Sequence, residues 1–149
     1  MSITALPEHR FSAAKTDLSR VMDTVVHEHQ PQVVRRGNRD LMLLVRPDDL
    51  SRWLDTFTFS FSVTPGEGDV AVAIEQVDVI GVGDTFDAAL DDAVEELRVR
   101  AQSYFERPQF YLQTDRAAHL PYLLRFALTP PEQQKALLAD DTCAGSKLL

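Results

Sequence analysis

The stretch VVRRGNRDLMLLV, residues 33–45, decides the fold of the first part of the chain. Two apolar runs flank Gly37 and Asn38, and a two-residue turn of this kind between such runs is typical of a β-hairpin. We therefore predict strands over residues 32–36 and 39–45, with Arg36 facing Arg39 across them. Like charges directly opposite destabilise a strand pair, and a sequence can tolerate such a pair when an anion lies between the two arginines.

The segments around the hairpin predict a small strand–helix–hairpin–helix unit over residues 1–55. A short strand is expected at 3–8. Apolar residues at helical spacing predict one helix over 12–29 with Ser12 as its N-cap, and Pro47 begins another helix over 47–55. The second hairpin strand is apolar on both faces, and the unit is small for an independent core. We therefore expect a second copy of the chain to cover the face that the helix leaves open.

Residues 56–106 predict an antiparallel sheet with a long helix packed on it. Large apolar and small polar residues alternate over 57–63, which is typical of a half-buried strand, and further strands are expected at 70–74 and 77–83. A helix then begins after Asp84 or Thr85. Its buried stripe is predicted to be Phe86, Leu90, Ala93, Leu97, Ala101 and Phe105.

Residues 107–149 predict a strand at 110–112, two helices and a tail. The first helix has an apolar face over residues 120–128, and the second begins at Pro130–Pro131 and ends at Asp140–Asp141. Residues 142–149 are expected to be disordered. The predicted fold class is therefore α+β, with a dimerising N-terminal unit, a sheet-and-helix domain and a helical C-terminal segment.

The charges are unevenly distributed along the chain. Residues 1–55 contain eight Lys/Arg and eight Asp/Glu, whereas residues 56–149 contain seven and fifteen, so the second part carries the whole net charge of −8. Such a split suggests two parts with different partners, although an ordinary solvated acidic surface explains it as well.

Residues 1–55 resemble the N-terminal domain of the prevent-host-death (Phd/YefM) antitoxins. The resemblance lies in the small-residue helix start SAAKTDLS, the hairpin VVRRGNRDLMLLV and the following PDDLSRWL. It implies a homodimer that binds operator DNA. In that family, basic residues at the start of the first helix and near the hairpin contact the DNA. The DNA-binding residues that it implies here are Arg10, Ser12, Lys15, Arg35, Arg36 and Arg39.

Two interpretations of these arginines remain open. Arginine, lysine, hydroxyl groups and helix N-termini are the groups that contact phosphates, which agrees with DNA binding. Alternatively, Arg35 and Arg36 pair with Asp40 or Asp48 and only keep the hairpin soluble.

Residues 56–106 resemble, more weakly, the HicB-like antitoxin domain, through the Phe-rich first strand and the helix start GVGDTFDAALDDAVEEL. The resemblance implies a sheet that covers a toxin, and an acidic surface suits a basic ribonuclease toxin. Candidate toxin contacts on the helix of this domain are Asp91, Asp92 and Glu95. Further candidates are Tyr122, Leu123 and Phe126 in the C-terminal segment, where the apolar stripe suits binding in a groove of the toxin. The alternatives are that the acids form a solvated helix face and that the YLLRF stripe, residues 122–126, packs on its own domain.

The sequence predicts neither an enzyme nor a cofactor or metal protein. His27 and His29 lie two residues apart and diverge on a helix, and the sequence has no nucleophile motif or Walker-type loop. One cysteine excludes an internal disulfide, and the N-terminus lacks a secretory pattern. We therefore expect a cytoplasmic protein without a membrane span.

Two functions follow from these observations. The first is a type II antitoxin that neutralises a protein toxin by direct binding and represses its own operon by binding operator DNA. The alternative is a protein-interaction module without DNA binding.

Overall fold

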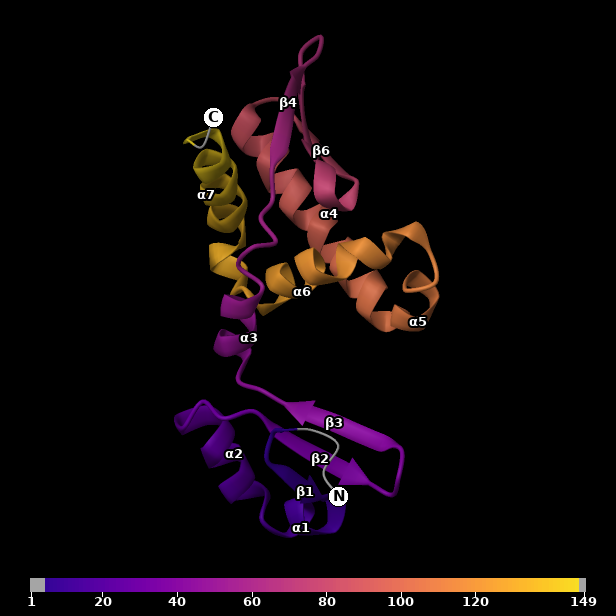
Figure 1. The fold of residues 1–149 in the computed structure, drawn as a ribbon. Helices are drawn as coiled ribbons and strands as arrows, with labels where there is room; N and C mark the ends of the chain where they lie inside the picture. Colours follow the sequence, from indigo (N-terminus) through magenta and orange to yellow (C-terminus); the bar gives the residue numbers. More distant parts are fainter. Residues whose placement is uncertain (1–4, 148–149) are drawn as a thin grey trace. The chain divides into compact units, whose positions relative to one another are not determined.

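The computed structural model describes residues 5–147 of the 149-residue chain. The chain divides into two compact units, residues 1–53 and 54–149, which Figure 1 shows as ribbons. Each unit contains one three-stranded sheet with helices. The predicted α+β class is confirmed.

The first unit is a mixed sheet in the order β1–β2–β3. β1 runs parallel to β2, and β2 runs antiparallel to β3. The elements are β1 (Glu8–Arg10), α1 (Phe11–Thr16), α2 (Leu18–His27), β2 (Gln32–Arg36), β3 (Asp40–Leu44) and α3 (Pro47–Trp53). Ala14, Val21 and Val34 form its buried core, with Leu44 packed against them.

The predicted single helix over residues 12–29 is two helices in the structure. Asp17 has φ −123° and ψ 40°, which is not helical, and it separates α1 from α2. The break lets Ala14 of α1 and Val21 of α2 reach the same core. The predicted strand at 3–8 is also displaced: the strand is Glu8–Arg10, and residues 3 and 4 lie outside the described part.

The hairpin turn differs from the prediction by one residue. Arg36 pairs with Asp40 in the β2–β3 register, so the turn contains three residues, 37–39. Gly37 begins it with φ 64°, in the left-handed region that glycine adopts without a Cβ penalty. Arg36 therefore does not face Arg39, and the like-charge pair inferred from a two-residue turn is wrong.

The second unit is an antiparallel sheet, β4–β5–β6, packed on α4. Its remaining helices pack on the same core, so residues 107–149 share one unit with the sheet. The elements are β4 (Phe61–Pro65), β5 (Val70–Ile74), η1 (Glu75–Val77), β6 (Val79–Gly83), α4 (Phe86–Glu106), α5 (Pro108–Tyr111), η2 (Asp115–His119), α6 (Leu120–Leu128), η3 (Pro131–Gln133) and α7 (Gln134–Lys147).

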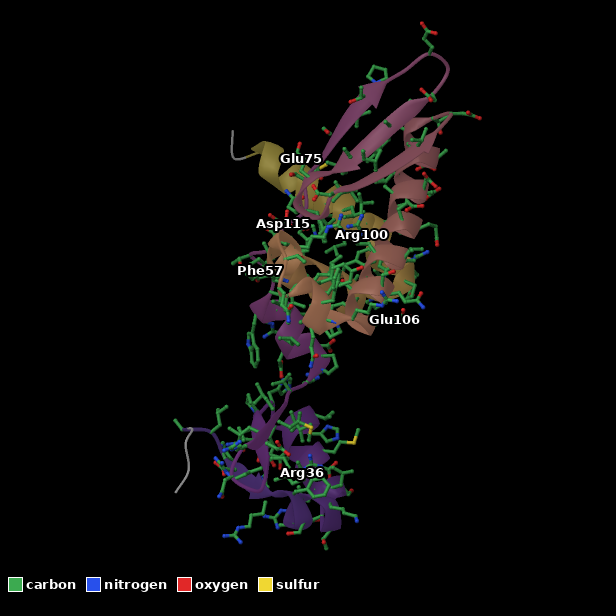
Figure 2. All side chains as sticks on the ribbon, turned by 90° about the vertical axis from the view of Figure 1, so that its right-hand side faces the viewer. Arg36, Phe57, Glu75, Arg100, Glu106 and Asp115 are labelled. Atoms are coloured by element: carbon green, nitrogen blue, oxygen red, sulfur yellow. The ribbon has the colours of Figure 1, made fainter. Side chains whose placement is uncertain are left out.

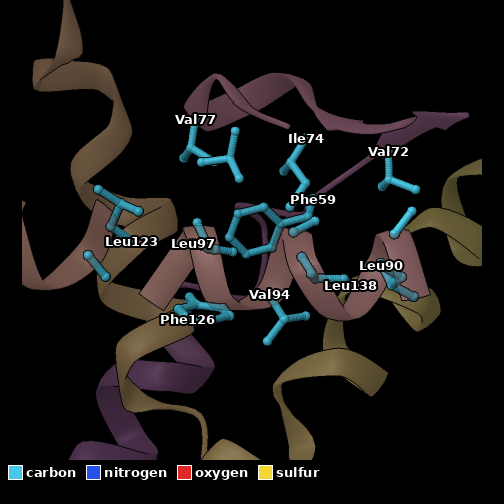
Figure 3. Close-up of a cluster of buried hydrophobic side chains, with 14 of the residues drawn as sticks. Phe59, Val72, Ile74, Val77, Leu90, Val94, Leu97, Leu123, Phe126 and Leu138 are labelled. Carbon is cyan, nitrogen blue, oxygen red and sulfur yellow. The ribbon is translucent and has the colours of Figure 1, made fainter. Parts of the chain in front are cut away.

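Helix α4 lies across one face of the sheet, and the hydrophobic core forms between them (Figure 3). Val72 and Ile74 lie on the side of β5 that faces α4, where Val72 stands above Leu90 of the helix. The Thr85 hydroxyl accepts a hydrogen bond from Ala88 N at 3.1 Å, which caps the helix as predicted. Four positions of the predicted stripe are buried, but Phe86 and Phe105 are exposed, and Tyr104 is buried instead.

Three predicted elements of the second unit differ in the structure. The strand predicted at 57–63 begins only at Phe61, and the strand predicted at 77–83 begins at Val79 because residues 75–77 form a 3₁₀ turn. The predicted strand at 110–112 is wrong: Pro108 begins the short helix α5, in which Tyr111 stacks on Tyr104 with ring centroids 4.8 Å apart. Helix α7 continues to Lys147, in place of a disordered tail from residue 142; residues 148 and 149 lie outside the described part.

Candidate functional site

A surface hollow of about 770 Å³ lies in the first unit where β1, the start of α1 and the β2–β3 hairpin meet. β1 and β2 bring its residues together, because Arg10 is the parallel register partner of Arg35. Four of the six predicted DNA-binding residues line it, and Lys15 and Arg39 do not. The lining residues are Glu8, Arg10, Phe11, Ser12, Arg35, Arg36, Gly37 and Asn38.

Arg35 is held in place by an ion pair with Glu8. Its Nε donates a hydrogen bond to Glu8 Oε1, and the two side chains are only 16% and 15% exposed. This hydrogen bond and the charge of Glu8 raise the pKa of Arg35 above its ordinary value. The buried Nη2 has no hydrogen-bond partner among the described residues. Arg35 is therefore fixed in position and charged, and its buried Nη2 is a donor that the described residues of the first unit leave unsatisfied.

Arg36 forms a different kind of pair, on the surface. Its Nε and Nη2 donate to Asp40 Oδ2 at 3.1 and 2.8 Å, and both side chains are well exposed; Figure 2 labels Arg36. An exposed pair of this kind contributes little to stability, so a stronger anion can displace the carboxylate. The pairing with Asp40 is the one that the alternative interpretation of the arginines expects.

The other three basic candidates, Arg10, Lys15 and Arg39, are exposed and make no ion pair within residues 5–147. Ser12 is also exposed but is not the N-cap of a helix: α1 begins at Phe11, with Arg10 in the capping position and no side-chain cap. That part of the prediction is wrong, because β1 runs directly into α1.

Sequence reasoning missed Glu8 as the partner of Arg35. The two residues lie 27 positions apart and meet only because β1 pairs in parallel with β2. The sequence places the first strand at residues 3–8, whereas the structure has it at Glu8–Arg10. No local signal in the sequence therefore identifies Glu8 as the partner of Arg35.

The acidic candidates in the second unit all have partners inside that unit. Asp91 pairs with Lys135 at 2.7 Å, and Glu95 pairs with Arg98. Asp92 Oδ2 accepts a hydrogen bond from Val82 N at 2.8 Å, at the edge strand β6. Asp92 therefore has a structural role that the helix pattern alone does not reveal.

The apolar toxin-binding candidates on α6 are mostly internal. Leu123 and Phe126 are 0% and 1% exposed and belong to the core of the second unit. Tyr122 is half-buried and lies edge-on to Phe57, with ring centroids 5.5 Å apart. The YLLRF stripe packs on its own unit, and the prediction that Leu123 and Phe126 contact a toxin is corrected, because a partner cannot reach them.

Residues 5–147 contain no group of three or more His, Cys, Asp or Glu side chains placed to hold a metal ion. Among the described helices, none has the length and apolar character needed to cross a bilayer.

Comparison with known proteins identifies the class of protein. Residues 5–139 match the PHD-like family, described as the antitoxin of RelE/RelB toxin–antitoxin systems. The match spans both units, and the chain belongs to this family of antitoxins. The family is not one of enzymes, in agreement with the sequence analysis, and its members have a cognate toxin as partner. The HicB-like resemblance of residues 56–106 stays a prediction.

A solved structure shares the fold. It is a crystal structure, at 1.80 Å resolution, of the antitoxin part of a proposed toxin–antitoxin system from Syntrophomonas wolfei subsp. wolfei. The TM-score is 0.76 at 21% sequence identity, over 89% of this chain and 96% of the other. Among the curated proteins, none is a significant match to this chain.

Proposed function

We propose that this antitoxin neutralises its cognate toxin by direct binding and, as a homodimer, binds operator DNA through its first unit to repress its own operon. The observation that carries the DNA-binding part is the hollow lined by Arg10, Ser12, Arg35 and Arg36. Glu8, the one carboxylate among the described residues that line it, is paired with Arg35.

The chemistry of the hollow suits a phosphate backbone. Arg10 is exposed and makes no ion pair within the described residues, and the Arg36 pair with Asp40 is exposed and exchangeable. Guanidinium groups bind phosphate oxygens in a bidentate way. Arg39 and Lys15 add exposed charge close by in the sequence. These residues support contacts that position a protein on a duplex.

The experiment measures binding to a labelled duplex from upstream of the gene, at two salt concentrations, beside a scrambled duplex. Replacing Arg10 and Arg39 by alanine should weaken binding and reduce the slope of log K against log salt by about 0.9 for each phosphate that is no longer neutralised. Arg52→Ala is the matched control, because Arg52 is an exposed arginine of α3 that belongs neither to the hollow, as Arg10 does, nor to the hairpin turn, as Arg39 does. Equal binding of both duplexes, or equal losses of affinity in both variants, would contradict DNA recognition by this surface.

The homodimer rests on apolar side chains that the first unit leaves exposed. Leu18 and Met22 lie one turn apart on α2, and Leu41, Met42 and Leu43 follow one another on the edge strand β3. The unit has a core of few residues. Covering these side chains with a second copy would remove apolar area from water and supply stability that the isolated unit lacks.

An interaction module without DNA binding is the second candidate function. It is favoured by the ion pairs Arg35–Glu8 and Arg36–Asp40, in which both arginines already have carboxylate partners. Replacing Arg35 and Arg36 by alanine separates the two candidates. If the arginines bind DNA, the affinity of the double variant for the duplex and the salt dependence of that affinity fall. If the arginines only pair with acids, neither the wild-type chain nor the variant binds the duplex, and only the stability of the first unit changes.

A further inference from the structure

The sheet of the second unit has one face that its own helices do not use. Val72, Ile74 and Val79 are buried against α4. Side chains alternate along a strand, so the residues between them point to the opposite face. The strand register sets them in two rows, Ser62–Ala73–Ile80 and Thr64–Ala71–Val82, which we call the outer face.

The outer face is uncharged and accessible. Its six residues are aliphatic or carry a single hydroxyl. Ile80 and Val82, the two largest, are 60% and 50% exposed, whereas Val72 on the helix side is 0% exposed. The solvent-facing side of an antiparallel sheet normally carries polar residues, so neighbouring branched aliphatic side chains there are unusual. The sheet therefore offers a flat apolar platform with a few hydroxyl groups.

Asp92 closes the edge of the sheet next to this platform. Its carboxylate accepts the hydrogen bond of Val82 N at 2.8 Å. A further strand added along β6 would need that N–H group, and placing a charged group at an edge is a known way to prevent strand addition. A partner at this end of the sheet is thus directed toward the face and away from the edge.

Carboxylates stand at both ends of the outer face. Glu67 and Asp69 lie in the turn between β4 and β5, and Asp78 and Asp84 lie immediately before and after β6. Glu67, Asp69 and Asp84 make no ion pair within the described residues. Asp78 Oδ2 lies 3.7 Å from His119 Nε2, but the Asp78 side chain remains 71% exposed. A second copy of the chain would bring like charges together, whereas a basic partner gains attraction and faster association.

We propose that the outer face is the docking surface for the cognate toxin, which presents an apolar patch bordered by lysine and arginine. This inference rests on the proposed function, in which the antitoxin binds its toxin directly. Ile80 and Val82 supply the apolar contact, and the carboxylates at the two ends orient the basic partner.

The test measures affinity between the full-length protein and its toxin by titration calorimetry. The probe is the purified product of the adjacent gene that arrests growth when expressed alone. Replacing Ile80 and Val82 by lysine should weaken binding by about tenfold or more, the size of effect typical of truncated hot-spot side chains. A threonine pair at the same positions keeps the branched shape that strands favour, so it tests the same surface without a risk to folding. Val99→Lys is the matched control, because Val99 is a branched residue of α4 with 59% exposure.

Each outcome decides the proposal. Weaker binding by both pairs, with full binding by Val99→Lys and unchanged circular dichroism, supports it. Unchanged affinity in the folded pairs, or an equally weakened Val99→Lys, overturns it while leaving direct toxin binding intact. If the wild-type chain does not bind the toxin, the proposed mode of neutralisation fails and the docking surface fails with it. A change of oligomeric state in the lysine pair, with toxin binding retained, assigns the face to a second copy and overturns the proposal.

Discussion

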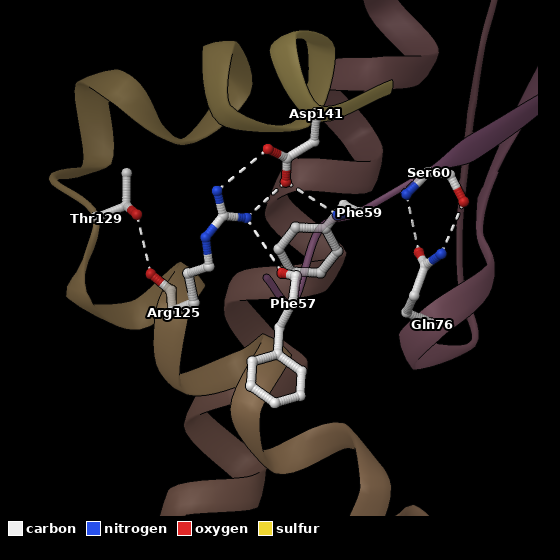
Figure 4. Close-up of polar contacts among 7 residues, drawn as sticks. All are labelled: Phe57, Phe59, Ser60, Gln76, Arg125, Thr129 and Asp141. Carbon is white, nitrogen blue, oxygen red and sulfur yellow. Dashed lines mark hydrogen bonds and ion pairs between the residues drawn. The ribbon is translucent and has the colours of Figure 1, made fainter. Parts of the chain in front are cut away.

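Arg125 and Asp141 form a bidentate ion pair inside the second unit and thereby join α6 to α7 (Figure 4). Arg125 Nη1 donates to Asp141 Oδ2 at 2.5 Å, and Nη2 donates to Oδ1 at 3.1 Å. The side chains are 11% and 9% exposed. The same pair also fixes residues 57–59, the segment before β4. Arg125 donates a hydrogen bond to the Phe57 carbonyl at 3.2 Å, and Asp141 accepts one from Phe59 N at 2.9 Å.

Removing one partner of this pair should destabilise the second unit strongly. In Asp141→Ala the buried guanidinium has no counter-ion, and a decrease of about 3–5 kcal/mol in the free energy of unfolding is expected. Urea denaturation followed by circular dichroism measures it. The double variant Arg125→Met with Asp141→Leu leaves no unpaired charge, so its stability should decrease much less. A double variant as unstable as Asp141→Ala would contradict this explanation.

Gly81 is a position where any side chain should displace α4. A Cβ atom there would lie 2.2 Å from Ala93 N and 2.3 Å from Ala89 O, which are backbone atoms of the helix. We expect Gly81→Ala to cost about 1–3 kcal/mol or more through overpacking, seen as a lower melting temperature. Gly68→Ala is the comparison for backbone strain without a clash, because Gly68 has open space around it but a positive φ of 83°. Equal destabilisation in the two variants would contradict close packing as the cause.

His119 should make the stability of the second unit depend on pH. The residue is 8% exposed, and burial lowers the pKa of its imidazole below 6.5. The carboxylates of Asp78 and Asp115 oppose this effect, and the guanidinium groups of Arg100 and Arg116 reinforce it. Figure 2 labels Arg100 and Asp115. The unfolded chain therefore binds a proton more readily than the folded chain.

The sign of this dependence follows from proton linkage. Stability should be complete above pH 6.5 and should fall as the pH drops through the lowered pKa of the folded state. Urea midpoints at about pH 7.5 and about pH 5, on either side of the ordinary histidine pKa, measure the fall. His119→Gln removes the titrating ring, so the difference between the two midpoints of the second unit should shrink in that variant. His27→Gln is the control, because α2 belongs to the first unit. An identical pH response in wild type and His119→Gln would contradict the assignment.

Charges placed on the exposed apolar side chains of the first unit should disrupt the proposed homodimer. Met22 and Leu43 are 63% and 53% exposed, so Met22→Lys and Leu43→Lys are expected to fold but to shift sedimentation toward the monomer at micromolar concentrations. Desolvating a charge in an interface is unfavourable, which explains the direction. Arg52→Glu, also on the surface of this unit, is the comparison. Unchanged sedimentation of both lysine variants would place the interface elsewhere.

Elements with a strong period or a strong end signal are predictable from the sequence. Helix α4 follows from its 3.6-residue period and from Thr85, and the structure has it over Phe86–Glu106. The hairpin follows from Gly37, although its turn is one residue longer than predicted. The sequence predicts a strand at residues 110–112, where the structure has the short helix α5, because a run of three aromatic and aliphatic residues fits either a strand or a helix. The stacking of Tyr111 on Tyr104 favours the helix.

The sequence predicts which basic residues belong to the candidate site, but it does not predict which residues they pair with. The sequence identifies the basic residues of the first helix and hairpin, and four of the six candidates line one hollow. It does not identify their partners, because Arg35 meets Glu8 only through the parallel pairing of β1 with β2. Similarly, the helix pattern indicates a surface acid at Asp92, and its bond to Val82 N depends on how α4 lies along β6.

The sequence by itself determined the local elements of this antitoxin, its split of charge and the chemistry available on its hairpin, because periodicity and turn residues act over a few neighbouring positions. Tertiary structure decided the break at Asp17, the Glu8–Arg35 pair and the joining of Phe59 to Asp141 across 82 positions. These features depend on which distant segments share a core. Burial of apolar surface selects that arrangement for the whole unit at once, and no short stretch of sequence contains it.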